Sequence, residues 1–376
     1  MQDATDSPNE APTRGGTAAG AYTTREPVFD GHNDFLLRLW SHESDRAQIW
    51  TERNDSGHLD LPRMREAGFA GGLFAIFVPP SERPGGKRFE ERMKDGPFSL
   101  PELPDVSLGP AQQVALGQAG LLMWMERTAP QAFAQCRSVA ELTAAMDAGK
   151  IAGMMHMEGA EAIDADLNAL HAFYAMGLRS LGPVWSRPTI FGEGVPFRFP
   201  GQPDTGPGLT DTGKRLVREC NALGIMIDLS HLNEKGFDDV ARLSDAPLVA
   251  THSNAHAICP SPRNLTDRQL AQIAETGGMV GLNLATFFLR PDGRARRDMG
   301  PNIVLRHLDH LLTHLGEAGV GIGSDFDGAQ LPDFVGDVTG VPLLIDAMRQ
   351  HGYGPELVAA VARDNWLSLL KRTLGG

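Results

Sequence analysis

Short apolar runs recur along the chain and alternate with stretches in which apolar residues are spaced as on one face of a helix. A short, continuous apolar run rich in β-prone residues is typical of a strand that is buried on both faces. We predict eight such strands, over residues 28–34, 71–78, 151–159, 178–185, 225–231, 247–252, 279–284 and 320–327.

Helical signals follow most of these runs. We predict helices over 59–68, over 111–127, from 138 onward, up to 176, and over 211–223, 234–243, 267–275, 302–318 and 356–370. Gly68 stops the first of them, and Ser138 with Glu141 has the spacing of a capping box. The segments 81–110 and 186–208 are rich in Pro and Gly and predict long loops. A polar segment without an element is predicted between the first strand and Gly57.

Buried strands separated by crossover helices indicate a parallel sheet, and eight such units are the number that closes a barrel. We therefore predict an α/β fold of the (β/α)8 TIM-type barrel class. A doubly wound open sheet is the alternative, but no Gly-x-Gly-x-x-Gly follows the first strand, as a dinucleotide-binding version would need. We expect a disordered tail over residues 1–25 and a single barrel domain over 26–376.

Charge and composition exclude several classes of protein. The formal net charge is -13 and the chain has no basic run, so a nucleic-acid partner is not expected. The first residues lack the features of a signal peptide, and no apolar run approaches the roughly 20 residues that span a bilayer, so we expect no membrane attachment. Cys136, Cys220 and Cys259 lack C-x-x-C spacing, which predicts reduced thiols and a cytoplasmic protein.

The active site of such a barrel lies at the carboxyl ends of its strands. Several predicted strands end in residues that can bind a metal or move a proton: His32 and Asp34, Glu158, His231, His252, and Asp325 with Asp327. His32 and Asp34 point the same way because they are two residues apart on a strand. His32, Asp34, Glu158, His231 and His252 together supply three imidazoles and two carboxylates, more than the three protein ligands of a one-zinc catalytic site. This excess suggests two metals that share a carboxylate.

Other histidines fall in predicted loops or helices, and we expect them to be solvated: His42, His58, His171, His307, His310, His314 and His351. His307, His310 and His314 have helical spacing and offer an alternative zinc face. Their helix lacks the His-Glu-x-x-His order, which weakens that alternative.

At these residues the sequence resembles the membrane (renal-type) dipeptidase family, zinc metallopeptidases with an amidohydrolase-like barrel. The resemblance extends from Val28 to Leu370. Its motifs are Asp30-Gly31-His32-Asn33-Asp34, Met157-Glu158-Gly159, Asp228-Leu229-Ser230-His231, Thr251-His252-Ser253-Asn254, Pro262-Arg263-Asn264 and Gly321-Ile322-Gly323-Ser324-Asp325-Phe326-Asp327-Gly328.

The resemblance implies two zinc ions per chain. It implies that His32 and Asp34 hold one ion, that His231 and His252 hold the other, and that Glu158 bridges them. Many related hydrolases bridge their metals with a carboxylated lysine instead, but no predicted strand here ends in Lys. The resemblance also suggests a homodimer.

Further roles follow from the same resemblance. It implies that Arg263 holds the terminal carboxylate of the substrate and that Asp325 handles the proton. The family usually has a histidine at the end of the fourth strand, thought to polarise the scissile carbonyl, whereas this chain has Trp185. We hypothesise that His156, which shares a strand face with Glu158, or Arg187 replaces this donor.

The predicted function is a zinc-dependent dipeptidase that hydrolyses small dipeptides through a metal-bridging hydroxide. The nearest alternative is a binuclear amidohydrolase of the same barrel type that acts on a non-peptide amide, such as an N-acyl amino acid, a lactam or a cyclic amide. A mononuclear iron oxygenase with two histidines and one carboxylate is a second alternative. A binding protein that kept the barrel but lost the carbonyl donor is a third.

Overall fold

The computed structural model describes residues 25–80 and 89–375. Its main sheet is parallel, in the strand order β8-β6-β5-β2-β1-β11-β10-β9. These strands are β1 (Val28–Asn33), β2 (Phe69–Phe77), β5 (Ile151–Glu158), β6 (Leu178–Gly182), β8 (Met226–Ile227), β9 (Val249–Ser253), β10 (Met279–Leu282) and β11 (Val320–Ile322). They correspond to the eight predicted strands, although several end earlier than predicted.

The two ends of this order meet. Asp228, directly after β8, forms a parallel bridge with Val249 of β9, and the Leu229 N–H donates to the Val249 carbonyl over 2.8 Å. The sheet is therefore a closed (β/α)8 barrel and not the open sheet that was the alternative. The predicted tail over 1–25 lies outside the described residues, apart from Arg25.

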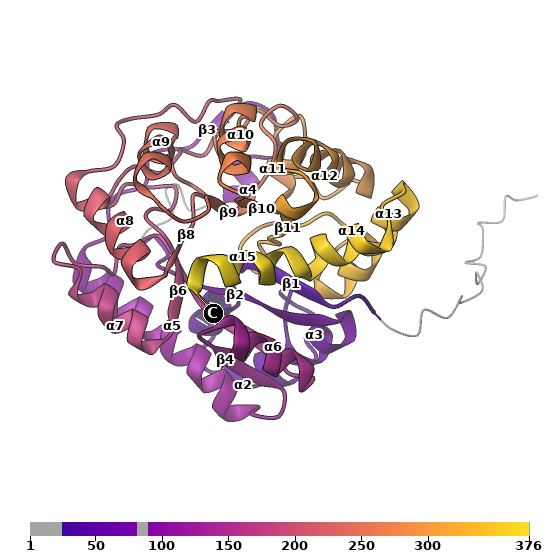
Figure 1. The fold of residues 1–376 in the computed structure, drawn as a ribbon. Coiled ribbons are helices and arrows are strands. Elements are labelled where there is room, and N and C mark those ends of the chain that lie inside the picture. Colours follow the sequence, from indigo (N-terminus) through magenta and orange to yellow (C-terminus); the bar gives the residue numbers. More distant parts are fainter. Residues whose placement is uncertain (1–24, 81–88, 376) are drawn as a thin grey trace, which may run out of the picture.

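Helices surround the sheet (Figure 1). They are α1 (Phe35–Ser41), α2 (Arg46–Thr51), α3 (Leu61–Ala67), α4 (Phe89–Arg92), α5 (Leu108–Thr128), α6 (Val139–Asp147), α7 (Asn168–Met176), α8 (Asp211–Leu223), α9 (Glu234–Leu243), α10 (Asp267–Glu275), α11 (Thr286–Leu289), α12 (Pro301–Leu315), α13 (Val341–His351), α14 (Pro355–Ala359) and α15 (Asn365–Leu374). Gly68 closes α3 with φ of 77°, as predicted. The Ser138 side chain accepts from the Glu141 N–H, but the Glu141 carboxylate accepts from the Arg137 N–H, so only half of the predicted capping box forms. Among the described residues, no helix is long and apolar enough to cross a membrane.

The element prediction is wrong in two places and right in a third. The segment after β1 is not without structure but forms α1 and α2, because buried residues such as Leu36 and Trp50 hold both helices against the core. α13 falls in a stretch for which no element was predicted. The closing helix predicted over 356–370 is confirmed: α14 continues through a π-helical turn over Ala360–Asp364 into α15 without a break.

Two pairings link segments that carry little strand signal. β4 (Phe133–Cys136) pairs with β5 outside the ring of the barrel. β3 (Phe98–Ser99) and β7 (Arg198–Phe199) pair antiparallel, and they join the two long segments that were predicted as loops. The Phe98 and Phe199 rings stack with centroids 6.3 Å apart.

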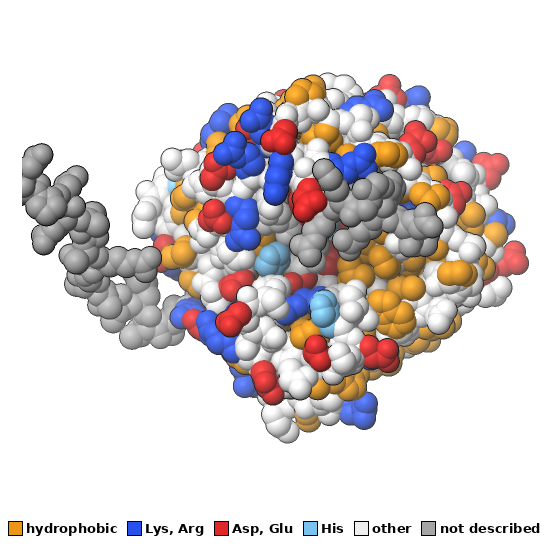
Figure 2. Space-filling model, turned by 180° about the vertical axis from the view of Figure 1, so that it is seen from behind, with side chains coloured by type: hydrophobic (Ala, Val, Ile, Leu, Met, Phe, Trp, Pro, Cys, Tyr) orange, Lys and Arg blue, Asp and Glu red, His pale blue; other side chains and the backbone are white. Residues whose placement is uncertain are grey.

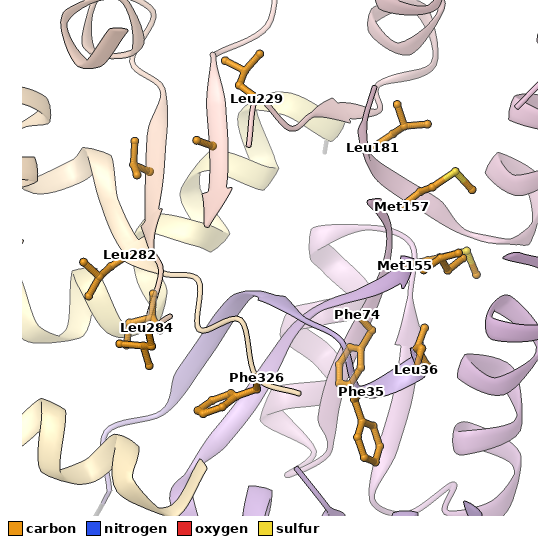
Figure 3. Packing of buried hydrophobic residues seen from close by; sticks show 14 of the residues in the cluster. Phe35, Leu36, Phe74, Met155, Met157, Leu181, Leu229, Leu282, Leu284 and Phe326 are labelled. Atoms are coloured by element: carbon orange, nitrogen blue, oxygen red, sulfur yellow. The ribbon is translucent and has the colours of Figure 1, made fainter. Parts of the chain in front are cut away.

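Side chains along β5 alternate between two environments. Met155 and Met157 belong to the apolar cluster between the sheet and the helices (Figure 3). His156 and Glu158 alternate with them and therefore face the barrel interior. Deeper in the barrel, Met154 belongs to a separate apolar cluster. The interior is thus apolar near the starts of the strands and polar near their carboxyl ends.

α15 lies across the end of the barrel at which the strands begin (Figure 1). Its Trp366 is fully buried, and the indole N–H donates to the Ile322 carbonyl over 2.9 Å. A Cβ on Gly31 or Gly321 would overlap this indole, so both strands need glycine there. The carboxyl ends of the strands remain available for a site on the opposite face.

His307 is not solvated, contrary to the prediction. It is fully buried, its Nδ1 accepts from the Ala255 N–H over 3.2 Å, and its Nε2 lies 2.9 Å from the Leu289 carbonyl oxygen. The ring gives hydrogen-bond partners to the Ala255 N–H and to the carbonyl of Leu289, the last residue of α11. His307 therefore has a structural role.

Candidate active site

Glu158 ends β5, and its two carboxylate oxygens face different groups of side chains. Oε2 lies 3.6 Å from His32 Nε2, which itself lies 3.4 Å from Asp34 Oδ2. Oε1 lies 3.0 Å from His231 Nε2 and 3.3 Å from His252 Nε2. Ligands of one tetrahedral zinc ion are roughly 3.3 Å apart, given zinc–ligand bonds of about 2.0–2.1 Å. The five side chains therefore offer two donor groups that share Glu158, His32 with Asp34 and His231 with His252. One ligand atom from each of His32, Glu158 and His252 also fits within 4.8 Å, so the two groups adjoin.

Hydrogen bonds orient two of the histidines. His231 Nδ1 lies 2.8 Å from Ser186 Oγ, and His252 Nδ1 lies 2.8 Å from Thr251 Oγ1. Such contacts to the second ring nitrogen are typical of metal-binding histidines, and they leave each Nε2 facing Glu158.

His32 carries the clearest sign of a missing ligand. The ring is completely buried and stacks on His252 with centroids 3.7 Å apart. Neither of its nitrogens has a hydrogen-bond partner among the described residues. Because buried polar atoms are nearly always satisfied, an orphaned imidazole beside two carboxylates fits a bound cation.

The charges around the site also fit a cation. Burial lowers the pKa of His32 to about 4 and holds the pKa values of His231 and His252 well below the ordinary range, so all three rings are neutral, as a metal ligand must be. Burial, with Asp327 nearby, raises the pKa of Asp34 to about 7, and burial next to Asp34 raises that of Glu158. Crowded, buried carboxylates beside neutral imidazoles are the donor set that divalent zinc prefers.

Asp325 follows β11 and faces the same space. Its Oδ2 accepts from the Asn283 side-chain amide over 2.9 Å, and burial raises its pKa. One ligand atom from each of Asp325, His32 and Asp34 fits within a group no wider than 4.8 Å. Asp325 and His231 both have left-handed backbones, with φ of 63° and 69°. Such strain, about 1–3 kcal/mol per residue, is typical of functional sites.

Gly328 brings the backbone against this site. A Cβ at this position would overlap Asp34 Oδ2 and Asp325 Oδ1. We expect Gly328→Ala to displace both carboxylates and to lower metal affinity and kcat/KM by about 10–100-fold each, the range for residues that orient metal ligands. Metal titration and steady-state kinetics measure the two effects.

Gly109→Ala is the matched control for this change, because Gly109 lies on a helix with nothing within 4 Å of an added Cβ. We expect Gly109→Ala to have the same metal affinity and turnover as the unsubstituted protein. An unchanged Gly328→Ala protein would contradict the close approach of Gly328 to the two carboxylates.

A cavity of about 80 Å³ opens beside these residues. Asp34, Glu158, His231 and Asp325 line one side of it, and the opposite wall is apolar: Leu37, Phe77, Trp185, Phe197, Phe287 and Phe288. The Trp185 ring packs against the rings of Phe77 and Phe197, with centroids 4.9 and 5.4 Å away. The cavity is far smaller than the roughly 300–1,000 Å³ of typical ligand pockets, so it suits a small substrate.

Arg263 lies behind the wall of this cavity and does not line it. Its guanidinium donates to Ser253 Oγ over 2.7 Å and to the His252 carbonyl over 2.8 Å, and it lies 5.6 Å from the ring of Phe288 in the cavity wall. Its Nε is buried without a hydrogen-bond partner among the described residues. Burial lowers its pKa to about 10, which still leaves it a cation at neutral pH.

His156 and Arg187 have other partners. His156 Nδ1 lies 2.8 Å from Ser180 Oγ, deeper in the barrel than Glu158. Arg187 donates to Glu161 over 2.6 Å, with its guanidinium 5.6 Å from the Trp185 ring. The residues that line the cavity do not include either side chain. The hypothesis that one of them replaces the missing donor stays a prediction, and unchanged kcat and KM in both His156→Ala and Arg187→Ala would refute it.

Two residues near the site were missed in the sequence. Asn283 follows β10 and holds Asp325. Asp228 follows β8 and accepts from the backbone N–H of Thr251 and of Ser230, which fixes the segments that carry His252 and His231. Asn283 is the next-to-last residue of a predicted strand, and Asp228 lies in the middle of another predicted strand but directly after the observed β8. Their positions near strand ends could have identified them, had we searched there for residues that hold the ligands as well as for the ligands themselves.

A (β/α)8 barrel with buried imidazoles and carboxylates at the carboxyl ends of its strands defines a metal-dependent hydrolase of the amidohydrolase type. The chain belongs to the membrane dipeptidase family (peptidase family M19), whose model matches residues 18–374. It is therefore a metallopeptidase that hydrolyses dipeptides, as the resemblance implied.

Several known proteins are similar to this chain. A metallopeptidase from Rhodobacter sphaeroides, solved with a phosphinate mimic of the dipeptide L-Ala-D-Ala, is 62% identical, with a TM-score of 0.92 over 93% of this chain and 100% of that one. An uncharacterized protein in the PQQ-III 3' region of Acinetobacter calcoaceticus is 42% identical over 76% of this chain and 89% of its own length. The probable dipeptidase PvdM from Pseudomonas aeruginosa shares the fold at 21% identity, with a TM-score of 0.78 over 93% of this chain and 96% of that one.

Proposed function

We propose that this metallopeptidase uses two zinc ions per chain, one held by His32 and Asp34 and the other by His231 and His252, with Glu158 as the shared ligand. The observation that carries the proposal is the position of Glu158, which turns one oxygen toward each donor group. The orphaned nitrogens of His32 support it. When bound, zinc would supply Lewis acidity that lowers the pKa of water toward about 7 and polarises the scissile carbonyl.

The chain's own residues would then handle binding and proton transfer. Asp325 takes the proton of the attacking water and delivers it to the leaving amine, and the raised pKa of its carboxyl suits both steps. Asn283 holds that carboxylate in place. Arg263 binds the terminal carboxylate of the dipeptide, and the aromatic wall excludes bulk water.

The substrates would be dipeptides with small side chains. The narrow cavity supports this, and so does the phosphinate mimic of L-Ala-D-Ala bound to the Rhodobacter sphaeroides relative. We further propose that the second residue can have the D configuration. Acidic and basic side chains are interspersed on the face opposite α15 (Figure 2). A surface with both signs of charge suits a zwitterionic ligand better than a polymer whose charges all have the same sign.

The first experiment is hydrolysis of a dipeptide library with L- and D-residues at the second position, followed by mass spectrometry. Zinc-reconstituted protein is compared with a chelated control. Zinc-dependent loss of small dipeptides is the expected result. If two metals bind but no dipeptide disappears, the reaction belongs to a non-peptide amide such as an N-acyl amino acid.

Trp185 should set the size limit for the substrate. We expect Trp185→Ala to shift the ratio of kcat/KM for Leu-containing over Ala-containing dipeptides upward by about 10-fold, because it removes part of the cavity wall. Competition kinetics with paired substrates measure this ratio. Trp124→Ala, on the helix α5 away from the cavity, should leave the ratio unchanged, and an unchanged ratio in Trp185→Ala would contradict the role of the wall.

We also propose that residues 26–376 form one domain, that the chain is a homodimer and that it works in the cytoplasm. The family match across 18–374 supports the first point. Cys136, Cys220 and Cys259 are free and buried, which suits a reducing compartment. Light scattering in solution tests the dimer, and a single mass equal to one chain would refute it.

A further inference from the structure

A second group of metal-ligating side chains lies on the outside of the barrel. His310 and His314 are one helical turn apart on α12, and their rings are 4.6 Å apart. Both turn Nε2 toward the same oxygen of Asp267, the first residue of α10. His310 Nε2 lies 2.7 Å from Asp267 Oδ1, and His314 Nε2 lies 3.7 Å from it.

The three side chains come from rigid, packed elements. α10 begins with a complete capping box between Thr266 and Gln269, which fixes the backbone of Asp267. Leu270 and Leu311, from the inner faces of α10 and α12, belong to the same buried cluster. The backbones that carry the three donors are therefore held in place by the fold.

We propose that Asp267, His310 and His314 form a peripheral site for a divalent transition-metal ion such as Zn²⁺. Two imidazoles and one carboxylate are the donors that zinc uses in three-ligand sites, with a fourth position left for water. The measured separations of 2.7 and 3.7 Å lie on either side of the roughly 3.3 Å expected between tetrahedral ligands. Side-chain exposures of 22% for His310 and 28% for His314 leave the site open to ions from solvent.

The contacts among the side chains leave one donor poorly satisfied: His310 and Asp267 share a hydrogen bond of 2.7 Å, whereas His314 Nε2 lies 3.7 Å from the same oxygen. One oxygen of Asp267 faces two imidazole nitrogens, and a single proton shared with His310 leaves the His314 nitrogen with a longer contact. A metal would satisfy all three donors at once. It would also join α10 to α12, the helices on either side of β10 in the chain, and stabilise the fold by mass action.

The test uses the full-length protein equilibrated with micromolar free Zn²⁺ and passed through gel filtration. Inductively coupled plasma mass spectrometry counts zinc per chain. We expect the His310→Ala/His314→Ala double variant to hold one zinc equivalent less than the original protein while its dipeptide hydrolysis stays unchanged. An anomalous difference map at the zinc edge should show a peak between Asp267, His310 and His314.

His171→Ala is the matched control, since His171 is an exposed histidine with a single carboxylate partner, Glu219 at 3.5 Å. It should keep the full zinc content. Equal zinc contents in the original and double-variant proteins, or a map without a peak between α10 and α12, would overturn the proposal. The map locates each ion separately, so a failure of the catalytic zinc proposal would not hide or mimic the result here.

Discussion

Replacing Glu158 by glutamine should cost the protein at least one metal equivalent per chain and lower kcat/KM by about 10³-fold or more. Both oxygens of Glu158 face histidine nitrogens, Oε2 toward His32 and Oε1 toward His231 and His252. Glutamine has a single acceptor oxygen, and its amide nitrogen cannot bind a cation. One donor group therefore loses its shared ligand, and the buried site loses a negative charge that offsets the metal ions.

Metal content by mass spectrometry and kinetics with a small dipeptide measure these losses. Glu161→Gln provides the control, because Glu161 is equally buried but pairs with Arg187 outside the donor groups. It should keep the full metal content. A Glu158→Gln protein with both metals and ordinary turnover would remove the basis for a shared carboxylate.

Replacing Asp325 by asparagine should preserve the metals but lower kcat by about 10²–10⁴-fold, the range for loss of a general acid–base group. The amide keeps the size of the side chain and can still accept from Asn283, but it cannot take a proton from water. The comparison of metal content with kcat is informative because Asp325 also lies close to His32 and Asp34. If the variant loses metal along with turnover, Asp325 is a ligand.

The Asp327→Asn variant distinguishes proton transfer by Asp325 from the mere loss of a negative charge near the site. Asp327 has the same left-handed backbone, with φ of 63°, but its carboxylate accepts from the backbone N–H of His58 over 2.7 Å. We expect it to reduce kcat much less than Asp325→Asn does. Equal losses in the two variants would argue against a specific proton-handling role for Asp325.

The strands and the polar residues at their ends could be predicted because both depend on local patterns. A strand buried on both faces needs a continuous apolar run, and its last residues fall at the carboxyl edge wherever the strand lies in the barrel. Glu158, for example, ends a run that includes Met154, Met155 and Met157, so its position followed from the chain alone. The same logic located His231 from its own strand.

Features that depend on distant contacts were not predictable. His307 has the spacing of a solvated helical residue, yet it is buried because two remote backbone segments need its ring. The pairing of β3 with β7 connects segments a hundred residues apart, each too short to carry a strand signal. The apolar wall of the cavity is likewise assembled from separate parts of the chain, namely α1, β2, α11 and the segment with Trp185 and Phe197. Only Trp185 was identified, through its departure from the family pattern.

The position of β1 between β2 and β11 has a consequence for how the protein is made. The first strand of the barrel pairs with the last, so the ring cannot close until β11 has left the ribosome, and Trp366 arrives later still. At roughly 5–20 residues per second, β1 waits tens of seconds for its partner. During synthesis one edge of β1 stays unpaired, and Asp325 joins the site only after all the other strands of the barrel have been made. The cavity at the carboxyl ends of the strands is therefore completed only when the last strand of the barrel has been made.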